Sequence, residues 1–579
     1  FVTHKDKFER QNKQIFSKRP NNLSVLNIPF KTRELKKVLK KCKNTSPGQD
    51  RLSYEMFKHL SNRCQDIILN LFNRIWEKGL IPQAWKHALI IPILKPNKSK
   101  SDPASYRPIA LTSNLCKLME RMVVTRLNWF LEKYNLLNRF QSGFRKKRNT
   151  IDQLLRLSDS IIKSLSNKSF VLSVFLDFEK AYDMVWRKGV LFKLHKLGVD
   201  GNIFNWINDF LQDRTFQVRV GSSTSALFCF ENGLPQGSVI SPVLFLIAIN
   251  DFNPSNVKFS LFADDAAVWK SGRNIKFLEK QMQNVLDYIQ DWCDKWGFRI
   301  SIAKTKFILF HRGRNKSLKL LLDGHPLEKV QDVKFLGMVF DQSLSWNKHI
   351  EYINNRCQKR INILKLLTGS KWGTDKETMV LLYKNLIRSI IDYGSIVYQS
   401  ACKTTLKKLD VIQSQALRLC CGALRCTPVQ ALEVDCGILP LNLRRKLLSL
   451  KAVIRYWENC SNPAEECFQD CYELYYGKFD QQFKPLTLKV LDTVKSLPRP
   501  LMNPVVDILP SWEYQDTIFD TGLADIINKS TDSSHFLLSN SLEYMEKYTT
   551  YLKIYTDGSK MGTKSSCAFY VPTLRYSKV

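Results

Sequence analysis

Two adjacent aspartates, Asp264 and Asp265, lie between two apolar runs in the stretch 259–269. The pattern predicts a strand, a tight turn that carries the aspartates, and a second strand. Neighbouring carboxylates repel each other, so such a pair is tolerated at a solvated turn or where a divalent cation neutralises it. A lone pair is most often a plain surface turn, but the flanking Phe, Leu, Val and Trp residues place this one at the edge of a core.

A third aspartate, Asp177, ends another apolar run, which begins at residue 172 and also predicts a strand. If this strand neighbours those around Asp264 and Asp265 in one sheet, the three carboxylates form an acidic cluster. Carboxylate oxygens are ligands of Mg²⁺, and a pair of such ions promotes displacement reactions at phosphorus. The three aspartates are therefore the candidate metal ligands and catalytic residues of the chain.

The chain is strongly basic: 88 Lys and Arg residues stand against 53 Asp and Glu residues, a formal net charge of +35 over 579 residues. The excess is spread along the sequence and is not confined to one tail. A solvated basic surface is the simple explanation, but an imbalance of this size favours a polyanionic partner, above all nucleic acid. The length and a hydrophobic content of 44% are enough for several packed domains.

The 15 cysteines show no repeated CxxC and no Cys/His knuckle. Cys420, Cys421, Cys426 and Cys436 cluster but lack the spacing of a zinc site. We interpret the cysteines as reduced, mostly buried thiols of an intracellular protein. No run approaches the length of a membrane span, and no signal peptide is visible. Because the sequence opens on Phe1, we expect a fragment of a longer protein.

Three short motifs occur in the order of a known family. They are D-x-x-x-A-Y-D at 177–183, G-L-P-Q-G-S at 233–238 and F-A-D-D at 262–265. Together they resemble the palm of reverse transcriptases, and the surrounding sequence is most similar to non-LTR (LINE-type) retrotransposon enzymes of the jockey group. The resemblance extends over residues 44–443, and residues 555–560 resemble the first strand of an RNase H domain.

The resemblance implies roles for residues near the aspartates. Tyr182 would abut the sugar of the incoming nucleotide and exclude a 2′-hydroxyl, although core packing also explains an aromatic ring there. Gln236 would brace the same nucleotide. Lys304 would protonate the leaving pyrophosphate, in a segment that carries Ser301 where Asn is usual. A solvated charge is the alternative for this lysine.

A predicted hairpin supplies candidate contacts to the triphosphate. Residues 89–96 and 106–111 resemble the family's fingers hairpin. Arg107 is the first candidate, because a guanidinium fork matches phosphate oxygens, and Lys95 is the second. Either residue could instead be a solvated surface charge.

Two further segments are candidates for contact with the nucleic-acid strands. Residues 139–148 mix cations with aromatic rings, a composition that suits phosphates and stacked bases. Within them Gly143, Phe144 and Arg145 belong to a motif that resembles the family's Q-S-G-F-R. Gly337 lies in residues 333–340, which we expect to form a strand and which resemble the primer grip.

We expect an α+β fold with the fingers, palm and thumb of a right-hand polymerase and an antiparallel palm sheet. Residues 191–211 are expected to be helical throughout, and a helix is expected to begin at a capping Thr32. The expected parts are an N-terminal tether (1–30), fingers and first palm helices (31–170), the palm with its catalytic motifs (171–342), a helical thumb and connection (343–457), a connector (458–550) and a truncated RNase H-like start (551–579).

The C-terminal patch contains Asp557, which resembles a metal ligand of RNase H. That chemistry needs several carboxylates, and no Asp or Glu follows Lys560. The fragment supplies a strand or two of a sheet that needs more. We therefore expect Asp557 to be an inert remnant and residues 551–579 to be poorly anchored.

The expected function is that of an RNA-directed DNA polymerase of a non-LTR retrotransposon, working with two Mg²⁺ ions. Its partners would be the element RNA, a DNA primer or target and deoxynucleoside triphosphates, with no membrane. In related elements an endonuclease domain lies upstream, and none is seen here. The expected location is a cytoplasmic ribonucleoprotein and the nucleus.

Two alternatives remain open. The first is a polymerase of the telomerase or group II intron type, against which the jockey-like thumb and the 555–559 patch argue. The second is a catalytically decayed, RNA-binding relic of a transposon. The presence of all three aspartates favours activity, or recent descent from an active enzyme.

Overall fold

The computed structural model describes residues 25–96, 98–313, 316–369, 373–457 and 462–467, with Lys5, Pro510 and Trp512, and in the C-terminal part residues 522–528, 530–549, 552–561, 564–572 and 576–578. The chain divides into two compact units, Phe1–Trp512 and Glu513–Val579. Within the described ranges no helix is long and apolar enough to cross a membrane.

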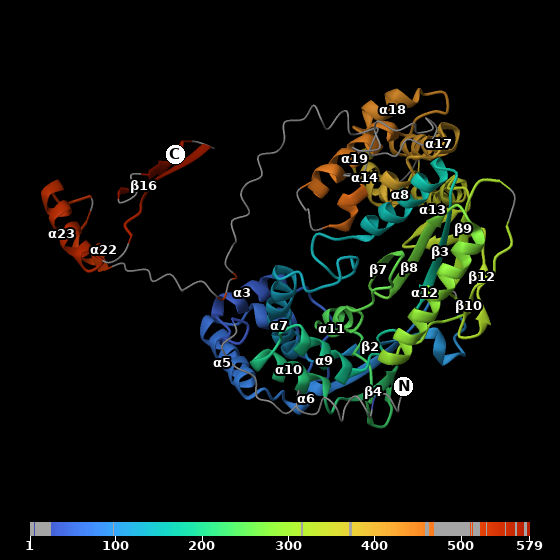
Figure 1. Cartoon of the computed structure of the whole chain (residues 1–579). Helices are drawn as coiled ribbons and strands as arrows, with labels where there is room; N and C mark the ends of the chain where they lie inside the picture. The colour runs from blue at the N-terminus through green and yellow to red at the C-terminus, as the bar shows by residue number, and fades with distance from the viewer. Residues whose placement is uncertain are drawn as a thin grey trace. The chain divides into compact units, whose positions relative to one another are not determined.

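A five-stranded sheet in the order β12-β9-β3-β8-β7 lies in the first unit (Figure 1). β3 pairs antiparallel with β8 and β9, and β7 pairs antiparallel with β8. The apolar runs around the three aspartates therefore form neighbouring strands of one sheet, as predicted. The strands are β3 (Phe170–Asp177), β7 (Lys258–Phe262), β8 (Asp265–Gly272), β9 (Lys306–Phe310) and β12 (Glu328–Lys329).

Neighbouring residues of β3 enter two different cores, because successive side chains of a strand point to opposite faces. Val174 packs in the core that includes helix α12 (Ile275–Trp296). Phe175 packs in a second core that includes helix α8 (Thr150–Ser166). A strand covered on both faces reads as a continuous apolar run. Asp177 is the polar residue at its end.

A second sheet has the order β2-β1-β4-β5, with β6 also paired to β4. β1 and β2 form the predicted antiparallel hairpin, in which Ile93 lies opposite Arg107. β1 also pairs parallel with β4. The strands are β1 (His87–Leu94), β2 (Tyr106–Leu111), β4 (Thr215–Val220), β5 (Ser223–Thr224) and β6 (Phe228–Cys229).

Helices accompany both sheets in the first part of this unit (Figure 1). They are α3 (Thr32–Lys41), α4 (Tyr54–Lys58), α5 (Asn62–Lys78), α6 (Gln83–Lys86), the 3-10 turn η1 (Pro103–Ser105), α7 (Asn114–Lys133), α9 (Arg187–Lys196), α10 (Gly201–Leu211) and α11 (Ser241–Ala248). α3 has Lys31 rather than Thr32 as its N-cap, and the backbone N–H of Lys31 donates to Oε2 of Glu34 at 2.9 Å.

The end of the predicted N-terminal tether is part of the core. Leu26 and Phe30 are buried, and Nη1 of Arg126 donates to the carbonyl of Leu26 at 3.1 Å. The prediction of a tether over 1–30 is thus wrong for residues 25–30. The earlier residues, Lys5 apart, lie outside the described ranges.

The predicted helix over 191–211 is instead two helices, α9 and α10. Gly198 follows α9 with a φ angle of +79°, a left-handed conformation that ends a helix and suits glycine. Gly201, the first residue of α10, also has a positive φ angle, +69°. Trp206 and Phe210 are buried on α10 as predicted, with ring centroids 5.3 Å apart.

The predicted strand over 333–340 is also divided. It forms the antiparallel hairpin of β13 (Asp332–Phe335) and β14 (Met338–Asp341), with Leu336 and Gly337 at the turn. Both turn residues have positive φ angles, 44° and 84°. An apolar alternation on both sides of a glycine fits a hairpin as well as a strand. Another short hairpin joins β10 (Leu321–Leu322) and β11 (His325–Pro326).

Within the described residues of the range 343–457, which was predicted to be helical, the chain forms a series of helices. α13 and α17 pack together with α14 around a core that contains Tyr383. The helices are α13 (Asn347–Leu366), α14 (Lys376–Tyr383), the π-helical turn η2 (Lys384–Arg388), α15 (Ser389–Asp392), α16 (Ser395–Tyr398), α17 (Lys403–Cys421), α18 (Val429–Asp435), α19 (Leu441–Trp457) and the 3-10 turn η3 (Pro463–Glu465).

The second unit contains a three-stranded antiparallel meander, β15 (Tyr555–Met561), β16 (Lys564–Val571) and β17 (Tyr576–Lys578), and the helices α22 (Gly522–Ile526) and α23 (Ser534–Glu546). The expectation of only a strand or two is therefore wrong. Asp557 lies in β15 opposite Ala568. Its side chain falls outside the described part of the structure.

Candidate active site

The ends of β3 and β8 bring two of the predicted aspartates together. Asp177 and Asp265 are cross-strand partners in the antiparallel ladder, which places their Cα atoms about 4.5–5.5 Å apart. Asp264 precedes Asp265 and follows Ala263, whose φ of 55° lies in the left-handed region. All three predicted aspartates therefore lie at one edge of the sheet.

The carboxyl groups at this edge disfavour each other's ionisation. Burial raises the pKa of Asp264, and the charge of Asp177 raises it further. Burial and the charges of Asp264 and Asp177 raise the pKa of Asp265 to about 6. The side chains of Asp264 and Asp265 still reach solvent. A cation arriving from solvent would relieve the repulsion.

This donor set fits a divalent cation. Mg²⁺ prefers carboxylate oxygen, keeps several of its waters and needs one or two carboxylates from the protein. The oxygens of the three aspartates do not all lie within 4.8 Å of one another. Within the described ranges, three potential ligands lie that close together elsewhere: Cys421 ends α17, Asp435 ends α18, and Cys436 follows directly.

Lys304 reaches the acidic edge from the loop before β9. Its Nζ lies 3.1 Å from Oδ2 of Asp177. Two hydrogen bonds tie this loop to the end of β3: Ser301 N–H donates to the Asp177 carbonyl at 2.8 Å, and Asp177 N–H donates to Oγ1 of Thr305 at 3.3 Å. The structure thus places Lys304 where the resemblance predicts it, and its role as an acid stays a prediction.

Tyr182 lies between helix α11 and the acidic turn. Its ring stacks on Phe245 with centroids 4.8 Å apart and an interplanar angle of 13°. Burial and the nearby charge of Asp264 raise the pKa of Tyr182. The ring therefore has the packing contact of a core aromatic and also faces the site, so the predicted contact with a nucleotide sugar remains compatible with its position.

The loop 233–238 is fastened beside Tyr182. Leu234 N–H donates to the carbonyl of Tyr182 at 2.9 Å, and a Cβ on Gly233 would lie 2.6 Å from the carbonyl oxygen of Asp183. Gln236 Nε2 donates to Oδ1 of Asp183 at 3.1 Å. Asp183 is therefore the partner of the predicted nucleotide-binding glutamine.

The β1–β2 hairpin meets the same loop. The Ala110 N–H donates to the carbonyl of Gln236 at 2.7 Å. Lys95 Nζ donates to the carbonyl of Ala104 at 2.9 Å. Burial raises the pKa of Asp183, and the positive charge of Lys95 lowers it in part. Lys95 therefore lies near the Gln236–Asp183 pair. Arg107 is exposed on β2.

Glu120 is a residue that the sequence interpretation missed. It is buried on α7, and its Oε2 accepts hydrogen bonds from the N–H groups of Val239 at 2.6 Å and Ile240 at 3.1 Å. These contacts fix the chain between Gln236 and α11. A carboxylate inside the apolar run of α7 is the signal that could have identified it, because an unpartnered buried charge is costly.

The residues of the Q-S-G-F-R motif have different environments. Gly143 packs against the acidic turn, where a Cβ would lie 2.2 Å from the backbone nitrogen of Ala263. Arg145 forms a two-pronged ion pair with Glu132, at 2.7 and 2.9 Å, and its side chain is 4% exposed. This burial favours a structural role for Arg145 over the predicted contact with nucleic acid. Phe144 is 52% exposed.

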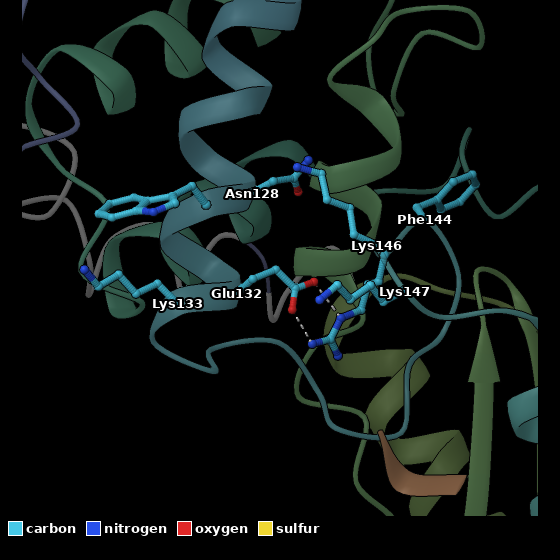
Figure 2. A pocket seen from close by; sticks show the side chains of 8 residues that line it. Asn128, Glu132, Lys133, Phe144, Lys146 and Lys147 are labelled. Carbon is cyan, nitrogen blue, oxygen red and sulfur yellow. Dashed lines mark hydrogen bonds and ion pairs between the residues drawn. The ribbon is translucent and has the colours of Figure 1, made fainter. Parts of the chain in front are cut away.

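A groove of about 550 Å³ lies between α7 and residues 144–147. Figure 2 shows Asn128, Glu132 and Lys133 on one side and Phe144, Lys146 and Lys147 on the other. Ammonium groups beside an exposed ring suit a single nucleic-acid strand. The groove is lined by Asn128, Trp129, Glu132, Lys133, Phe144, Arg145, Lys146 and Lys147.

Gly337 is held by the helical region that follows. The hydroxyl of Tyr393 donates to the carbonyl of Leu336 at 2.6 Å and contacts Oγ1 of Thr150 at 3.0 Å. A Cβ on Gly337 would lie 3.2 Å from the Tyr393 ring. The turn that resembles a primer grip is thus fixed by the helical region, and its contact with a primer stays a prediction.

The fold and the acidic edge agree with a comparison against protein families. Residues 93–340 match the family described as "Reverse transcriptase (RNA-dependent DNA polymerase)". This segment contains β3, β7, β8 and the three aspartates. Residues 93–340 are therefore a segment of the reverse transcriptase family.

Curated relatives confirm the jockey-like resemblance. The chain is 30% identical over 387 residues to the "RNA-directed DNA polymerase from mobile element jockey" of Drosophila melanogaster, covering 65% of this chain and 42% of that protein. It is 31% identical over 414 residues to the protein of that name from Drosophila funebris, covering 70% and 45%. The chain thus spans less than half the length of these relatives.

A comparison with solved structures finds a telomerase from Candida albicans in complex with a fragment of telomeric RNA. The likeness has a TM-score of 0.35 and 12% identity, covering 74% of this chain and 68% of that one.

Proposed function

We propose that the chain is the RNA-directed DNA polymerase portion of a non-LTR retrotransposon protein and copies the element RNA into DNA. The observation that carries the proposal is the pairing of Asp177 with Asp265, beside Asp264, within a segment of the reverse transcriptase family. The names of the jockey relatives support an RNA template and a DNA product.

Two Mg²⁺ ions would be held by Asp177, Asp264 and Asp265. When bound, they supply a lowered pKa for the primer 3′-hydroxyl and a counter-charge for the triphosphate. The protein's part is to hold three carboxylates on adjacent strand ends, where their mutual repulsion favours binding of cations. Lys304, released from Asp177, would hold a proton near the leaving pyrophosphate.

The incoming deoxynucleotide would lie between the acidic edge and the β1–β2 hairpin. Arg107 and Lys95 would contact its phosphates, and Tyr182 would block a 2′-hydroxyl. Gln236 would brace it, with its amide held by Asp183. The hydrogen bond between Ala110 and Gln236 supports this arrangement, because it joins the hairpin to the nucleotide-side loop.

The nucleic-acid strands would contact Phe144 and the lysines of its groove, and the turn at Gly337. Gly143 would serve by its close packing on the acidic turn. The net charge of +35 supports extensive phosphate contacts.

In this proposal residues 31–170 supply fingers and first palm helices, 171–342 the palm, and 343–457 the thumb. Residues 458–550 would be a connector, and 551–579 would be the start of an RNase H-like domain with an inert Asp557. The protein would act in a cytoplasmic ribonucleoprotein and in the nucleus, which fractionation of expressing cells would test.

The test is extension of oligo(dT) on poly(rA) by the purified chain, with Mg²⁺ and with EDTA. We expect extension that needs Mg²⁺ and is lost in Asp264→Asn. The control is binding of the labelled RNA/DNA hybrid by the same variant, which should be unchanged. Binding without extension in the wild-type chain would identify a decayed, RNA-binding relic and overturn the proposal.

A further inference from the structure

We infer that Gln141 is a positioning residue for Asp264: its side-chain amide fixes the turn from which that aspartate projects. The functional part of this inference rests on the proposed polymerase activity. Gln141 touches none of the three aspartate side chains in the described contacts, so its effect would pass through the backbone of Ala263.

The amide of Gln141 makes two hydrogen bonds that clamp the backbone of Ala263 and a third with Gly143. Its Oε1 accepts from the N–H of Ala263 at 3.0 Å and from the N–H of Gly143 at 2.7 Å. Its Nε2 donates to the carbonyl of Ala263 at 3.3 Å. The residue is 2% exposed, so these bonds form away from water. A buried amide of this kind satisfies both polar groups of Ala263.

Ala263 is the residue whose conformation needs such support. Its φ of 55° is in the left-handed region, which is unfavourable for a residue with a Cβ. Without its partner the turn would be expected to relax toward commoner conformations. Asp264 follows directly, so a change at Ala263 would redirect its carboxylate and alter its position relative to Asp177.

The segment around Gln141 is built to approach the turn closely. Ser142 N–H donates to the carbonyl of Leu261 at 2.9 Å, and Leu261 N–H donates to the carbonyl of Phe140 at 3.1 Å. Gln141 therefore lies beside β7 as a short parallel bridge. Gly143 completes the approach, since any Cβ there would collide with the nitrogen of Ala263.

Helix α8 contacts the segment around Gln141 through hydrogen bonds. Gln153 Nε2 donates to the carbonyl of Phe140 at 2.9 Å and to Oγ of Ser142 at 2.6 Å. Arg156 donates to Oε1 of Gln153 and to the carbonyl of Phe259, both at 2.9 Å. The amide of Gln141 is thus presented by a network of buried hydrogen bonds, which keeps it aimed at Ala263.

The matched control is Gln283 on α12. Its amide holds another backbone in the same way: Oε1 accepts from the N–H of Leu321 at 2.9 Å, and Nε2 donates to the carbonyl of Leu321 at 3.0 Å. Gln283 thus clamps the backbone of Leu321 in β10, outside the candidate site. Gln141→Ala and Gln283→Ala therefore remove the same kind of contact at two places.

The first measurement is the Mg²⁺ dependence of primer extension. For Gln141→Ala we expect the Mg²⁺ concentration at half-maximal rate to rise at least tenfold, with the KM for dTTP and the affinity for the RNA/DNA hybrid within twofold of wild type. Gln141→Asn keeps the amide on a shorter side chain. Its Mg²⁺ concentration at half-maximal rate should lie between those of wild type and Gln141→Ala. Gln283→Ala should match wild type. A Mg²⁺ dependence unchanged in both Gln141 variants would overturn the inference.

The second measurement needs no activity. Hydrogen–deuterium exchange of a peptide covering residues 261–266 should be at least tenfold faster in both Gln141 variants, and unchanged in Gln283→Ala. If the wild-type chain fails to extend primers while this pattern holds, the polymerase proposal fails and the clamp stands. Unchanged exchange in a folded Gln141→Asn variant would overturn the clamp itself, whatever the activity.

Discussion

The ammonium group of Lys304 lies 3.1 Å from a carboxylate oxygen of Asp177 at the acidic edge of the sheet. The two side chains are 69% and 40% exposed, and ion pairs of this kind contribute little to stability. The contact is therefore easily exchanged. In the proposed mechanism a metal ion at Asp177 and the Lys304 ammonium compete for one carboxylate.

Replacing Lys304 by Ala should separate metal binding from catalysis. We expect half-saturation at a lower Mg²⁺ concentration, because the competing cation is gone. The rate at saturating Mg²⁺ should fall by about 100-fold or more, the usual loss when a general acid is removed. Lys306→Ala, which removes a lysine paired with Glu328 at 3.0 Å, is the control. Equal Mg²⁺ profiles and rates for wild type and Lys304→Ala would contradict both roles.

The raised pKa of Asp265 predicts a pH-dependent stability. A folded-state pKa of about 6, against about 3.9 in an unfolded chain, means that the folded protein binds this proton more tightly. The stabilisation is present below pH 4 and is lost as pH rises through 6. In EDTA, Asp265→Asn should therefore have a higher Tm than wild type at pH 8, with a gap that closes toward pH 4.

Millimolar Mg²⁺ should reverse that comparison. A cation that binds the folded state raises its Tm, and the wild-type carboxylate offers the better site. Thermal unfolding followed by circular dichroism, at each pH with EDTA or Mg²⁺, measures both effects. A gap independent of pH would show that Asp265 titrates normally.

How much of this site was predictable depends on the range of the contacts. The strands at 172–177 and 259–269 follow from apolar patterning, and their pairing places the aspartates together. The left-handed turns at Gly198 and Gly337 were signalled only by single glycines. The burial of Arg145 and the clamp by Gln141 depend on partners elsewhere in the chain, Glu132 and Ala263, so no local pattern revealed them.

Tyr182→Val should relax the choice of sugar. Shortening the side chain would remove the obstacle to a 2′-hydroxyl, while the stack on Phe245 is also lost. We expect the ratio of dTTP to UTP incorporation to fall at least tenfold. Tyr182→Phe, which keeps the ring and its stack, is the control and should retain the wild-type ratio. A ratio unchanged in Tyr182→Val would assign the ring to packing alone.

Arg126→Leu should destabilise the first unit strongly. The guanidinium is buried and bonds the Glu34 carboxylate at 2.8 and 3.0 Å as well as the carbonyl of Leu26. Removing it leaves a buried carboxylate without its cation, which costs about 3–5 kcal/mol. Urea unfolding followed by tryptophan fluorescence measures the loss. Lys376→Ala, which breaks an exposed pair with Asp435, should leave the midpoint unchanged.

Among the cysteines that the structure describes, Cys402 should react most readily at neutral pH. It is exposed at the N-cap of α17, with its Sγ 3.1 Å from Oγ1 of Thr404 and 2.9 Å from Oγ1 of Thr405. Hydrogen bonds from these hydroxyls and backbone N–H groups lower its pKa to about 7. Because thiolates are the reactive form, the rate of alkylation by iodoacetamide should rise through pH 7 and level off above pH 8.

Peptide mass spectrometry after timed labelling would follow each cysteine separately, with the exposed Cys64 as the internal comparison. Thr404→Ala should move the Cys402 profile to higher pH without changing that of Cys64. A Cys402 profile that keeps rising past pH 9 in the wild-type chain would show that the helix terminus and its hydroxyls do not stabilise the thiolate.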